Sequence, residues 1–533
     1  MDHDMHLATA WERVAELIPD ADATICGDDV RSWASFEGRS ARLSAGFEAA
    51  GAGPDSKVAH YLYNGHEYLE TTFAAFKMRG VPCNVNYRYT PHELAYVLEN
   101  ADAEVVVFDH TLVDRLDEAR RHVPTLRLAV QVGGDHVPDW AVDYEALIDA
   151  HEPAPPRRRS VDDRWFLYTG GTTGMPKAVM WSQATIFGSM DAAVRSFGDG
   201  YPSTMAELDG IITTAAGRGH AVRQLAAAPL MHGTSMIVGF GTLTHGGAIA
   251  CLEERHFSGH ELWQRVAQHR VTQLTIVGDA FSRPMLDALG EADYDTSSLR
   301  AIVSSGVMWN ADVKERLLDH LPDVVLLDAL GSSEGPGMAN QVSSRRHRRS
   351  GTTARFELGE HTRVFTDDGD EVQAGSGDVG RIALGFPIPV GYYKDPDKTD
   401  QTFPMIEGRR WSIPGDYATI EADGTITLLG RGSVCINTGG EKVFPEEVEE
   451  ALKTHPNVVD ANVVGLPDER WGQSVNAVVS TDAAVDVDEL RSHLRRDLAG
   501  YKIPKRIELV DEIQRQANGK ADYPWARAVL ERR

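Results

Sequence analysis

A segment rich in glycine and threonine, YTGGTTGMPK, occupies residues 168–177. Glycine lets backbone amides turn toward a bound anion, threonine hydroxyls add hydrogen-bond donors, and Lys177 adds a positive charge. The spacing differs from the GxxxxGK[ST] pattern of a Walker P-loop. A turn that only connects two strands is the simpler alternative, but the density of donors favours a phosphate-binding loop. Its candidate contacts are Thr169, Gly170, Gly171, Thr172, Thr173, Gly174 and Lys177.

Two charged residues farther along the chain also suit a nucleotide. Asp416 follows a Pro-Gly turn, and its two carboxylate oxygens could accept hydrogen bonds from both hydroxyls of a ribose. An aspartate that only stabilises its own turn is the alternative. Lys520 follows a glycine near the C-terminus of a chain that has 11 lysines and 42 arginines. A lysine near a C-terminus is usually exposed surface; the scarcity of lysine and the preceding glycine favour a chemical role for Lys520 only together with the other motifs of the chain.

Further short motifs follow in order along the chain. They are APLMHG (228–233), GSSEG (331–335), PGDYA (414–418), GRGSVCINTGGEKVFPEEVE (430–449) and NGK (518–520). Together with residues 168–177, these motifs resemble those of the adenylate-forming superfamily, which includes acyl-CoA synthetases, beetle luciferases and adenylation domains of peptide synthetases. The resemblance predicts an AMP-forming acid–CoA ligase, whose substrates are a small-molecule carboxylic acid, ATP and coenzyme A.

The resemblance implies a role for each matching residue. Lys520 would bridge the carboxylate and the α-phosphate as negative charge develops, with His232 beside the carboxylate and Lys177 at the phosphates. Glu334 would hold Mg²⁺, which prefers few carboxylates together with phosphate oxygens. A solvated loop glutamate is the alternative for Glu334.

Other matching residues would contact the two nucleotides. Asp416 and Arg431 would bind the ribose of ATP. Gly439 and Gly440 would border a narrow path for the pantetheine arm of coenzyme A, because glycine has no Cβ; a simple turn before a helix is the alternative. The remaining nucleotide contacts implied by the motifs are Ser332, Ser333 and Lys442.

The sequence departs from the superfamily pattern at three positions. Leu330 replaces the usual aromatic residue that stacks on adenine, Ser333 replaces threonine, and Ser433 replaces the usual Asp or Lys of the hinge. These departures resemble actinobacterial ligases of long-chain and sterol side-chain acids, which predicts a bulky apolar acid as substrate. The apolar stretch Met236–Phe240 could line the acyl pocket, although ordinary core packing is the interpretation that such a stretch favours.

The pattern of apolar residues predicts the elements that position these motifs. Between about residues 57 and 330, short apolar runs alternate with amphipathic segments, which is typical of βα units around mostly parallel sheets. Thr90 and Glu93 form a capping box that begins a helix, and Asn310 caps another. Residues 152–160 read as an exposed connector, and 197–222 as a loop-rich insertion.

After Gly430 the pattern changes to that of a separate α+β domain. The predicted fold class is therefore α/β for a large N-terminal domain with mostly parallel sheets, plus a small mobile α+β domain, as in the adenylate-forming enzymes. The predicted boundaries are 1–430 for the large domain, 431–433 for the hinge linker and 434–533 for the small domain that carries Lys520.

Composition narrows the class of partners and the compartment. The net charge of −26 argues against nucleic acid as a partner, because nucleic acid favours basic surfaces. Four scattered cysteines predict no disulfide framework, and an acidic N-terminus without an apolar core predicts no signal peptide. The sequence therefore predicts a cytoplasmic protein without an integral membrane segment, and it is compatible with a homodimer.

Two other functions remain open from the sequence. An adenylation enzyme that loads a carrier protein, or a luciferase-like oxygenase, would share the same motifs. A nucleotide-binding protein that has lost catalysis would be expected to lack the charged residues, yet Lys177, Glu334, Asp416 and Lys520 are all present.

Overall fold

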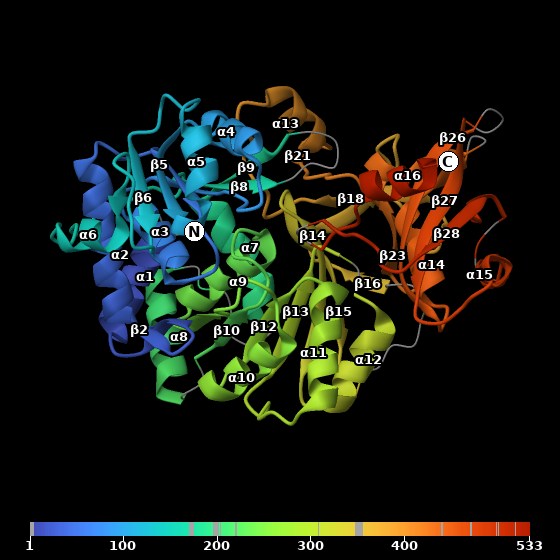
Figure 1. The fold of residues 1–533 in the computed structure, drawn as a ribbon, viewed down its shortest axis with the longest axis horizontal. Coiled ribbons are helices and arrows are strands. Elements are labelled where there is room, and N and C mark those ends of the chain that lie inside the picture. The colour runs from blue at the N-terminus through green and yellow to red at the C-terminus, as the bar shows by residue number, and fades with distance from the viewer. Residues whose placement is uncertain are drawn as a thin grey trace.

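The computed structural model describes residues 5–169, 175–195, 202, 204–218, 221–307, 309–346, 355–438, 441–468, 472–496, 498, 500–516 and 519–532. Two large sheets form the N-terminal part of the chain, and a five-stranded sheet forms the C-terminal part at the right of Figure 1. We refer to the residues from Ile436 onward as the C-terminal domain. The architecture confirms the predicted fold class.

The first large sheet has eight strands and carries the glycine-rich motif at one side. Its neighbours run parallel from β8 to β7, whereas β8 and β9 form an antiparallel hairpin that ends at Thr169 and Lys177. In spatial order the strands are β19 (Gly391–Tyr392), β9 (Lys177–Ser182), β8 (Arg164–Thr169), β4 (Val81–Asn84), β3 (Lys57–Tyr61), β5 (Ala103–Asp109), β6 (Leu128–Val132) and β7 (Val142–Asp143).

The second large sheet has thirteen strands. Its neighbours run parallel from β14 to β1, and the strands beyond β14 extend it in an antiparallel arrangement. In spatial order the strands are β17 (Thr362–Phe365), β18 (Val379–Leu384), β22 (Asp416–Ile420), β23 (Thr425–Arg431), β16 (Arg355–Leu358), β15 (Gly335–Ser343), β14 (Val325–Ser332), β13 (Ala301–Ser305), β12 (Gln273–Ile276), β10 (Arg223–Ala226), β11 (Ala248–Cys251), β1 (Asp22–Cys26) and β2 (Asp29–Ser32).

Helices cover both faces of the two sheets, as parallel sheets require. Helices between the sheets are α1 (Leu7–Leu17), α2 (Trp33–Ala49), α3 (His66–Lys77), α7 (Gln183–Arg195) and α9 (Gly233–Thr244). The outer face of the eight-stranded sheet packs against α4 (Pro91–Asn100) and α5 (Val113–Arg120). The outer face of the thirteen-stranded sheet packs against α10 (Gly259–His269), α11 (Asp279–Glu291) and α12 (Ala311–His320).

Several further elements of the N-terminal part flank these layers. They are α6 (Tyr144–Asp149), α8 (Met205–Arg218), α13 (Pro396–Thr402) and the hairpin of β20 (Met405–Ile406) and β21 (Arg409–Arg410). No described helix has both the length and the apolar character needed to span a membrane. All four cysteines are free thiols.

The C-terminal domain is an antiparallel sheet with one parallel edge strand. Its strands are β25 (Glu441–Val443), β24 (Ile436–Thr438), β27 (Gly472–Thr481), β26 (Val458–Asp468) and β28 (Arg506–Val510). One face packs against α14 (Pro445–Lys453) and α15 (Val487–Leu494), and the other face packs against α16 (Tyr523–Glu531). This arrangement of helices and strands agrees with the α+β pattern expected after Gly430.

Both helix starts predicted from capping residues are confirmed. The hydroxyl of Thr90 accepts a hydrogen bond from the Glu93 amide (3.4 Å), and the Glu93 carboxylate accepts one from the Thr90 amide (2.8 Å). The side-chain oxygen of Asn310 accepts a hydrogen bond from the Asp312 amide at 2.8 Å. These reciprocal contacts satisfy amides that have no partner within a helix.

Two predictions about connecting segments are wrong in part. The stretch 197–222 contains α8, because its apolar residues Leu208 and Ile212 share one helical face and are buried near α1. The connector 152–160 is mostly exposed, but Arg159 is buried and binds Glu12 with both terminal nitrogens at 2.7 Å. A buried carboxylate needs such a partner, which no local sequence pattern reveals.

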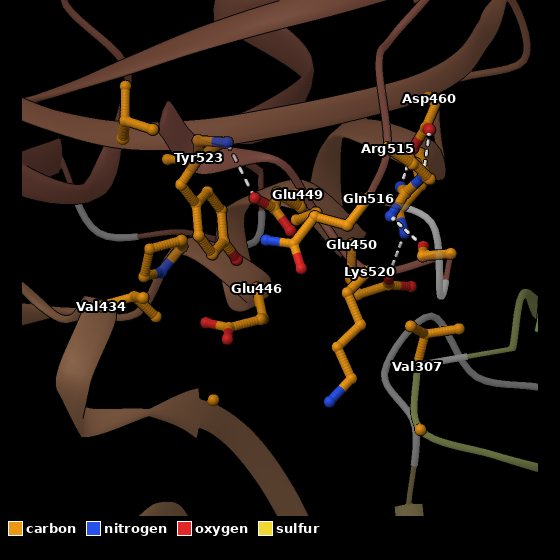
Figure 2. Close-up of a pocket in the computed structure, with 18 of the residues that line it drawn as sticks. Val307, Val434, Glu446, Glu449, Glu450, Asp460, Arg515, Gln516, Lys520 and Tyr523 are labelled. Atoms are coloured by element: carbon orange, nitrogen blue, oxygen red, sulfur yellow. Dashed lines mark hydrogen bonds and ion pairs between the residues drawn. The ribbon is translucent and has the colours of Figure 1, made fainter. Parts of the chain in front are cut away.

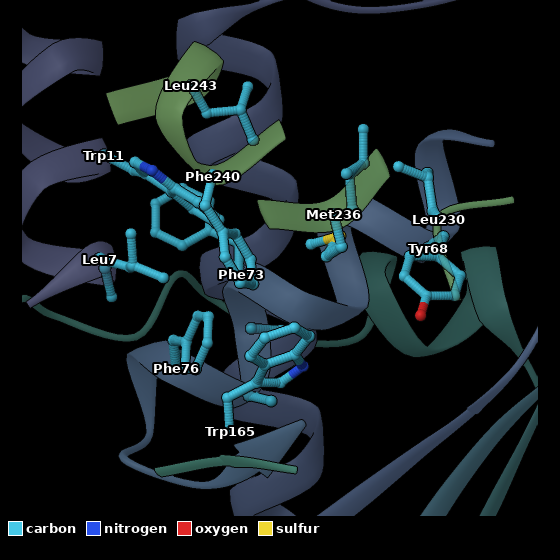
Figure 3. Close-up of a cluster of buried hydrophobic side chains, with 14 of the residues drawn as sticks. Leu7, Trp11, Tyr68, Phe73, Phe76, Trp165, Leu230, Met236, Phe240 and Leu243 are labelled. Carbon is cyan, nitrogen blue, oxygen red and sulfur yellow. The ribbon is translucent and has the colours of Figure 1, made fainter. Parts of the chain in front are cut away.

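The stretch Met236–Phe240 packs in the core between the two sheets. Phe240 is fully buried, and its ring lies 5.0 Å from that of Trp165 and 6.0 Å from those of Trp11 and Phe76. Figure 3 shows Met236 in the same cluster. Core packing is therefore the interpretation that holds for Met236 and Phe240.

Replacing Phe240 tests this assignment. We expect Phe240→Ala to lower the free energy of unfolding by about 3–5 kcal/mol, because it removes three ring contacts and leaves a cavity. Val30→Ala is the control, since Val30 is 43% exposed and should change stability by less than about 0.5 kcal/mol. Urea unfolding measures both. A loss below about 1 kcal/mol for Phe240→Ala would contradict the core assignment.

Candidate active site

A cavity of about 980 Å³ lies where the C-terminal domain meets the thirteen-stranded sheet. Leu330, Gly331 and Asp416 line it from the sheet, and Lys520 lines it from the C-terminal domain. Two charged residues that the sequence analysis singled out, Asp416 and Lys520, therefore face one space. Neither part of the chain forms this cavity alone.

Lys520 sits on a tight turn at the wall of the cavity. The Gln516 amide donates a hydrogen bond to the Lys520 carbonyl, and the Gly519 amide donates one to the Gln516 carbonyl, both at 2.8 Å. Gly519 has a φ of +79°, which glycine adopts without steric cost. Figure 2 shows the Lys520 side chain extending into the cavity near Val307. The turn thus presents an ammonium group to whatever occupies this space.

Backbone pairing brings the predicted ribose-binding pair together. Asp416 begins β22 and lies directly opposite Arg431, the last residue of β23. The Asp416 side chain is largely buried at the cavity wall. The two oxygens of a carboxylate at the cavity wall could accept hydrogen bonds from two hydroxyl groups of a ligand.

Glu334 lies in the turn between β14 and β15, next to the cavity residue Gly331. Its carboxylate accepts a hydrogen bond from the Tyr392 hydroxyl at 2.7 Å. The Ser332 hydroxyl accepts a hydrogen bond from the Glu334 amide (3.2 Å), and the Ser333 carbonyl accepts one from the Trp181 ring nitrogen (3.1 Å). These contacts fix both the turn and the direction of the carboxylate.

The carboxylate of Glu334 suits a magnesium ion that takes its other ligands from a bound phosphate. Among the described residues, no group of three or more His, Cys, Asp or Glu side chains could hold a metal by itself. Magnesium commonly uses one or two carboxylates and takes its other ligands from substrate phosphates and water. Glu334, three residues after the cavity residue Gly331, supplies one oriented carboxylate, which meets that requirement.

Lys177 lies near Tyr392, the residue whose hydroxyl binds Glu334. Its ammonium binds Asp395 at 2.5 Å and lies 5.9 Å from the centre of the Tyr392 ring. This ion pair lowers the pKa of the Asp395 carboxyl. Thr169 faces Lys177 across the hairpin, and the loop that joins them is where the phosphate contacts were predicted. A phosphate would compete with Asp395 for Lys177.

His232 stands immediately before helix α9, and the Nε2 atom of its imidazole is buried. Its Nε2 atom has no hydrogen-bond partner among the described residues. Burial, with smaller contributions from the charges of Lys520 and Arg88, lowers the pKa of His232 to about 4. The imidazole is therefore neutral near pH 7 and lies within electrostatic range of Lys520. An orphaned buried nitrogen in this position suits a polar ligand atom.

Two asparagines position the segment before His232, and the sequence analysis did not identify them. The Asn84 amide group donates to the carbonyls of Tyr168 (3.0 Å) and Met231 (2.7 Å), and its oxygen accepts from the Tyr168 amide (2.6 Å). Asn64 similarly contacts Ala226, Ala228 and Leu230. Asn84 thereby joins the strand that leads into the glycine-rich loop to the residue before His232.

Several predicted site residues carry no structural description here. Gly170, Gly171, Thr172, Thr173 and Gly174 of the loop and the Gly439–Gly440 pair lie outside the described residues. Lys442 belongs to β25, where its backbone faces Asn437. Their roles therefore stay predictions.

The C-terminal domain also contributes acidic groups that sequence analysis missed. Glu449 is buried against the cavity, and its carboxylate accepts a hydrogen bond from the Val463 amide at 2.8 Å. Burial and the nearby Glu446 raise the pKa of Glu449 to about 8. On the opposite wall, burial raises the pKa of Asp328 to about 6, although Lys314 binds it at 3.1 Å.

Comparisons with known proteins agree on one family. Residues 11–393 match the AMP-binding enzyme family, and residues 447–520 match the AMP-binding enzyme C-terminal domain. A 3-oxocholest-4-en-26-oate–CoA ligase from Rhodococcus rhodochrous is 38% identical over 98% of this chain and 95% of its own. A medium/long-chain-fatty-acid–CoA/3-oxocholest-4-en-26-oate–CoA ligase from Mycobacterium tuberculosis is 39% identical over 99% of this chain and 97% of its own.

A solved structure shares the fold along nearly the whole chain. The anthranilate CoA ligase AuaEII, solved in complex with anthranoyl-AMP, superimposes with a TM-score of 0.82. It covers 99% of this chain and 98% of its own at 19% identity. At that identity the similarity establishes the arrangement of sheets and domains.

The buried Glu449 should make stability depend on pH. Its folded pKa of about 8 exceeds the usual value of 4.5, so the folded state keeps a proton that the unfolded state loses between these values. Stability should therefore fall as the pH rises from about 5 to 8. Glu449→Gln mimics the protonated acid and should flatten this dependence, as measured by urea unfolding at several pH values.

The exposed Asp482 of the same domain provides a control. Asp482→Asn should leave the pH dependence of stability as in the unmodified chain. An unchanged slope in Glu449→Gln would show that Glu449 is ionised in the folded state at neutral pH.

Proposed function

Because this chain belongs to the AMP-binding enzyme family, we propose that it is an AMP-forming acid–CoA ligase. The observation that carries this proposal is the cavity shared by Asp416 of the thirteen-stranded sheet and Lys520 of the C-terminal domain. Relatives that match along nearly the full length are CoA ligases by name. ATP, coenzyme A and a carboxylic acid are thus the substrates.

In the first step a carboxylate oxygen attacks the α-phosphorus of ATP, and pyrophosphate leaves as the bond to the β-phosphate breaks. Lys520 places a positive charge where negative charge builds up between the two reactants. His232, neutral and buried, donates a hydrogen bond from Nε2 to the carboxylate in the tautomer that carries the proton there. Both side chains align the acid for in-line attack.

The remaining contacts hold ATP in place for this step. Asp416 and Arg431 bind the ribose, and Leu330 packs against the adenine. Lys177 exchanges Asp395 for a phosphate oxygen. Glu334 would hold a Mg²⁺, which would supply positive charge to the leaving pyrophosphate. Ser332, Ser333 and the loop from Thr169 to Gly174 provide hydroxyl and amide donors to the phosphates.

In the second step the thiolate of coenzyme A attacks the acyl carbon, and AMP leaves with the oxygen of the acid. We assign residues 1–430 to a large domain, 431–433 to a hinge and 434–533 to a small domain that rotates between the steps. Rotation moves Lys520 away and brings Gly439, Gly440 and Lys442 to the acyl group. A cytoplasmic location and a homodimer stay predictions from the sequence.

A bulky apolar acid is the proposed substrate class. The support is the full-length similarity to ligases named for steroid side-chain and medium- or long-chain fatty acids. Since Met236 and Phe240 fill the core, the acyl chain must bind elsewhere. By their nearness to the motifs, the segments 277–283, 304–309 and 331–337 are further candidates, and Ala280, Gly306 and Val307 in them line the cavity.

A panel of acids tests the activity and the substrate class together. With ATP, Mg²⁺ and coenzyme A, we expect pyrophosphate release and a CoA thioester, detected by mass spectrometry, with long-chain and steroid acids. Pyrophosphate release without thioester would favour an enzyme that loads a carrier protein, and no release with any acid would favour a non-catalytic nucleotide-binding protein. A preference for acetate or benzoate would contradict the bulky substrate.

Lys520→Ala tests the division of labour between the two steps. We expect pyrophosphate release to fall about a hundredfold or more, which is typical when a preorganised charge at a developing anion is deleted. The same variant, given synthetic acyl-adenylate and coenzyme A, should form thioester at nearly the unmodified rate.

A bulky substitution at Gly440 should show the reverse pattern, with adenylation preserved and thioester formation blocked. If a folded Lys520→Ala variant slows both steps equally, Lys520 does not serve the first step alone, and the rotation of the small domain is not supported.

A further inference from the structure

The turn that presents Lys520 is anchored by a single guanidinium group. Arg515 begins this turn and pairs with Ala521 in a short antiparallel bridge. Its Nη1 atom donates a hydrogen bond to the carbonyl of Gly519 at 3.3 Å, one residue before Lys520. The side chain of Arg515 thus closes the turn from within, in addition to the backbone hydrogen bonds.

The other nitrogens of Arg515 bind the carboxylate of Asp460. The Nε atom contacts Oδ2 at 2.7 Å, and Nη2 contacts Oδ1, so the pair is bidentate. Two parallel hydrogen bonds fix the orientation of both groups, which a single contact would not. Figure 2 shows Asp460, Arg515 and Lys520 in succession along one side of the cavity.

Asp460 is itself held in a rigid place. It lies in β26, beside an irregularity in the pairing of β26 with β27 between Val458 and Asp460. Such bulges redirect a side chain relative to the regular strand. The Asp460 Oδ1 atom also accepts a hydrogen bond from the Ala461 amide at 2.9 Å. The sheet of the C-terminal domain is therefore connected to the Lys520 turn through Asp460 and Arg515.

Residues of the large domain also contact the Lys520 turn and the strand that carries Asp460. A Cβ placed on Gly519 would lie 3.6 Å from Ala280 and 3.7 Å from Val277, so the turn rests on the start of α11. Arg283 of α11 donates to the Val459 carbonyl at 3.4 Å, next to Asp460. Burial opposes the charge of Arg515. The carboxylates of Asp460, Glu449 and Asp279 outweigh this effect and keep the pKa of the Arg515 guanidinium above its usual value.

We propose that Arg515 and Asp460 are positioning residues for adenylation, which hold the Lys520 turn at the distance from α11 that the first step requires. The inference rests on the proposed role of Lys520. The lysine side chain is flexible, so the place of its ammonium depends on where its backbone is held. A displacement of about 1 Å can cost about a hundredfold in rate. An ion pair that only stabilised the domain would affect both steps alike.

The two half-reactions separate positioning from stability. Asp460→Asn removes the charge from the bidentate pair, and Arg515→Lys keeps the charge but loses the fork that binds two oxygens. We expect each full-length variant to release pyrophosphate about 10 to 100 times more slowly than the unmodified enzyme. Each should form thioester from synthetic acyl-adenylate and coenzyme A at nearly the unmodified rate.

Glu447→Gln provides a matched control in the same domain. Glu447 binds Lys502 at 2.6 Å, and the two side chains are about as exposed as Asp460 and Arg515. Neither takes part in the turn of Lys520. We expect Glu447→Gln and Asp460→Asn to lower the melting temperature by similar amounts, while only Asp460→Asn slows pyrophosphate release.

Comparison of Lys520→Ala with the unmodified enzyme in the same assay tests the proposed function separately from the positioning role of Asp460 and Arg515. Pyrophosphate release that is lost in Lys520→Ala supports the proposed function. With that established, rates in Asp460→Asn and Arg515→Lys equal to the rate of Glu447→Gln would overturn the positioning role alone. Equal slowing of both half-reactions in these variants would also overturn it, because the pair would then be an ordinary stabilising contact.

Discussion

The packing of the Gly519–Lys520 turn against Val277 and Ala280 brings a cation to a cavity that is otherwise rich in carboxylates. The chain as a whole carries a net charge of −26, so its long-range field repels an anion such as ATP. Binding a polyphosphate therefore depends on cations placed within a few ångströms. Since Lys520 belongs to one part of the chain and Asp416 to another, the site is complete only while the two parts are in contact.

Most of the fold could be predicted because its signals are local. Strands buried on both faces appear as continuous apolar runs, as at Val105–Phe108 in β5, and a capping box such as that of Thr90 needs only four consecutive residues. Helix α8 was missed because glycine, threonine and alanine dilute its apolar face, and its burial near α1 is a property of the folded chain. Likewise, burial of Phe240 is decided by Trp11 and Trp165, which are distant in sequence.

The same contrast between local signals and contacts of distant residues applies to the candidate site. Motifs that bind one ligand with consecutive residues, such as 168–177, are visible in the sequence. Contacts that position those motifs are not visible in the sequence. Asn84 forms hydrogen bonds with Tyr168 and Met231, which lie 84 and 147 positions farther along the chain, and Lys177 pairs with Asp395, 218 positions farther along. Asparagine and aspartate are common in loops and at strand ends, so nothing in their local sequence distinguishes these from others. The shape of the acyl pocket is equally non-local, which is why the acid stays a proposal.

Strand β1 illustrates what this topology demands during synthesis. Its parallel neighbour is β11, with Thr24 beside Ile249 and Cys26 beside Cys251. At ordinary translation speeds, on the order of 10 to 45 s separate the emergence of the two strands from the ribosome. In that interval β1 has only its hairpin partner β2, and a two-stranded hairpin is at best marginally stable in water. The nascent chain must therefore keep an apolar strand without its parallel neighbour until nearly half of the protein has been made.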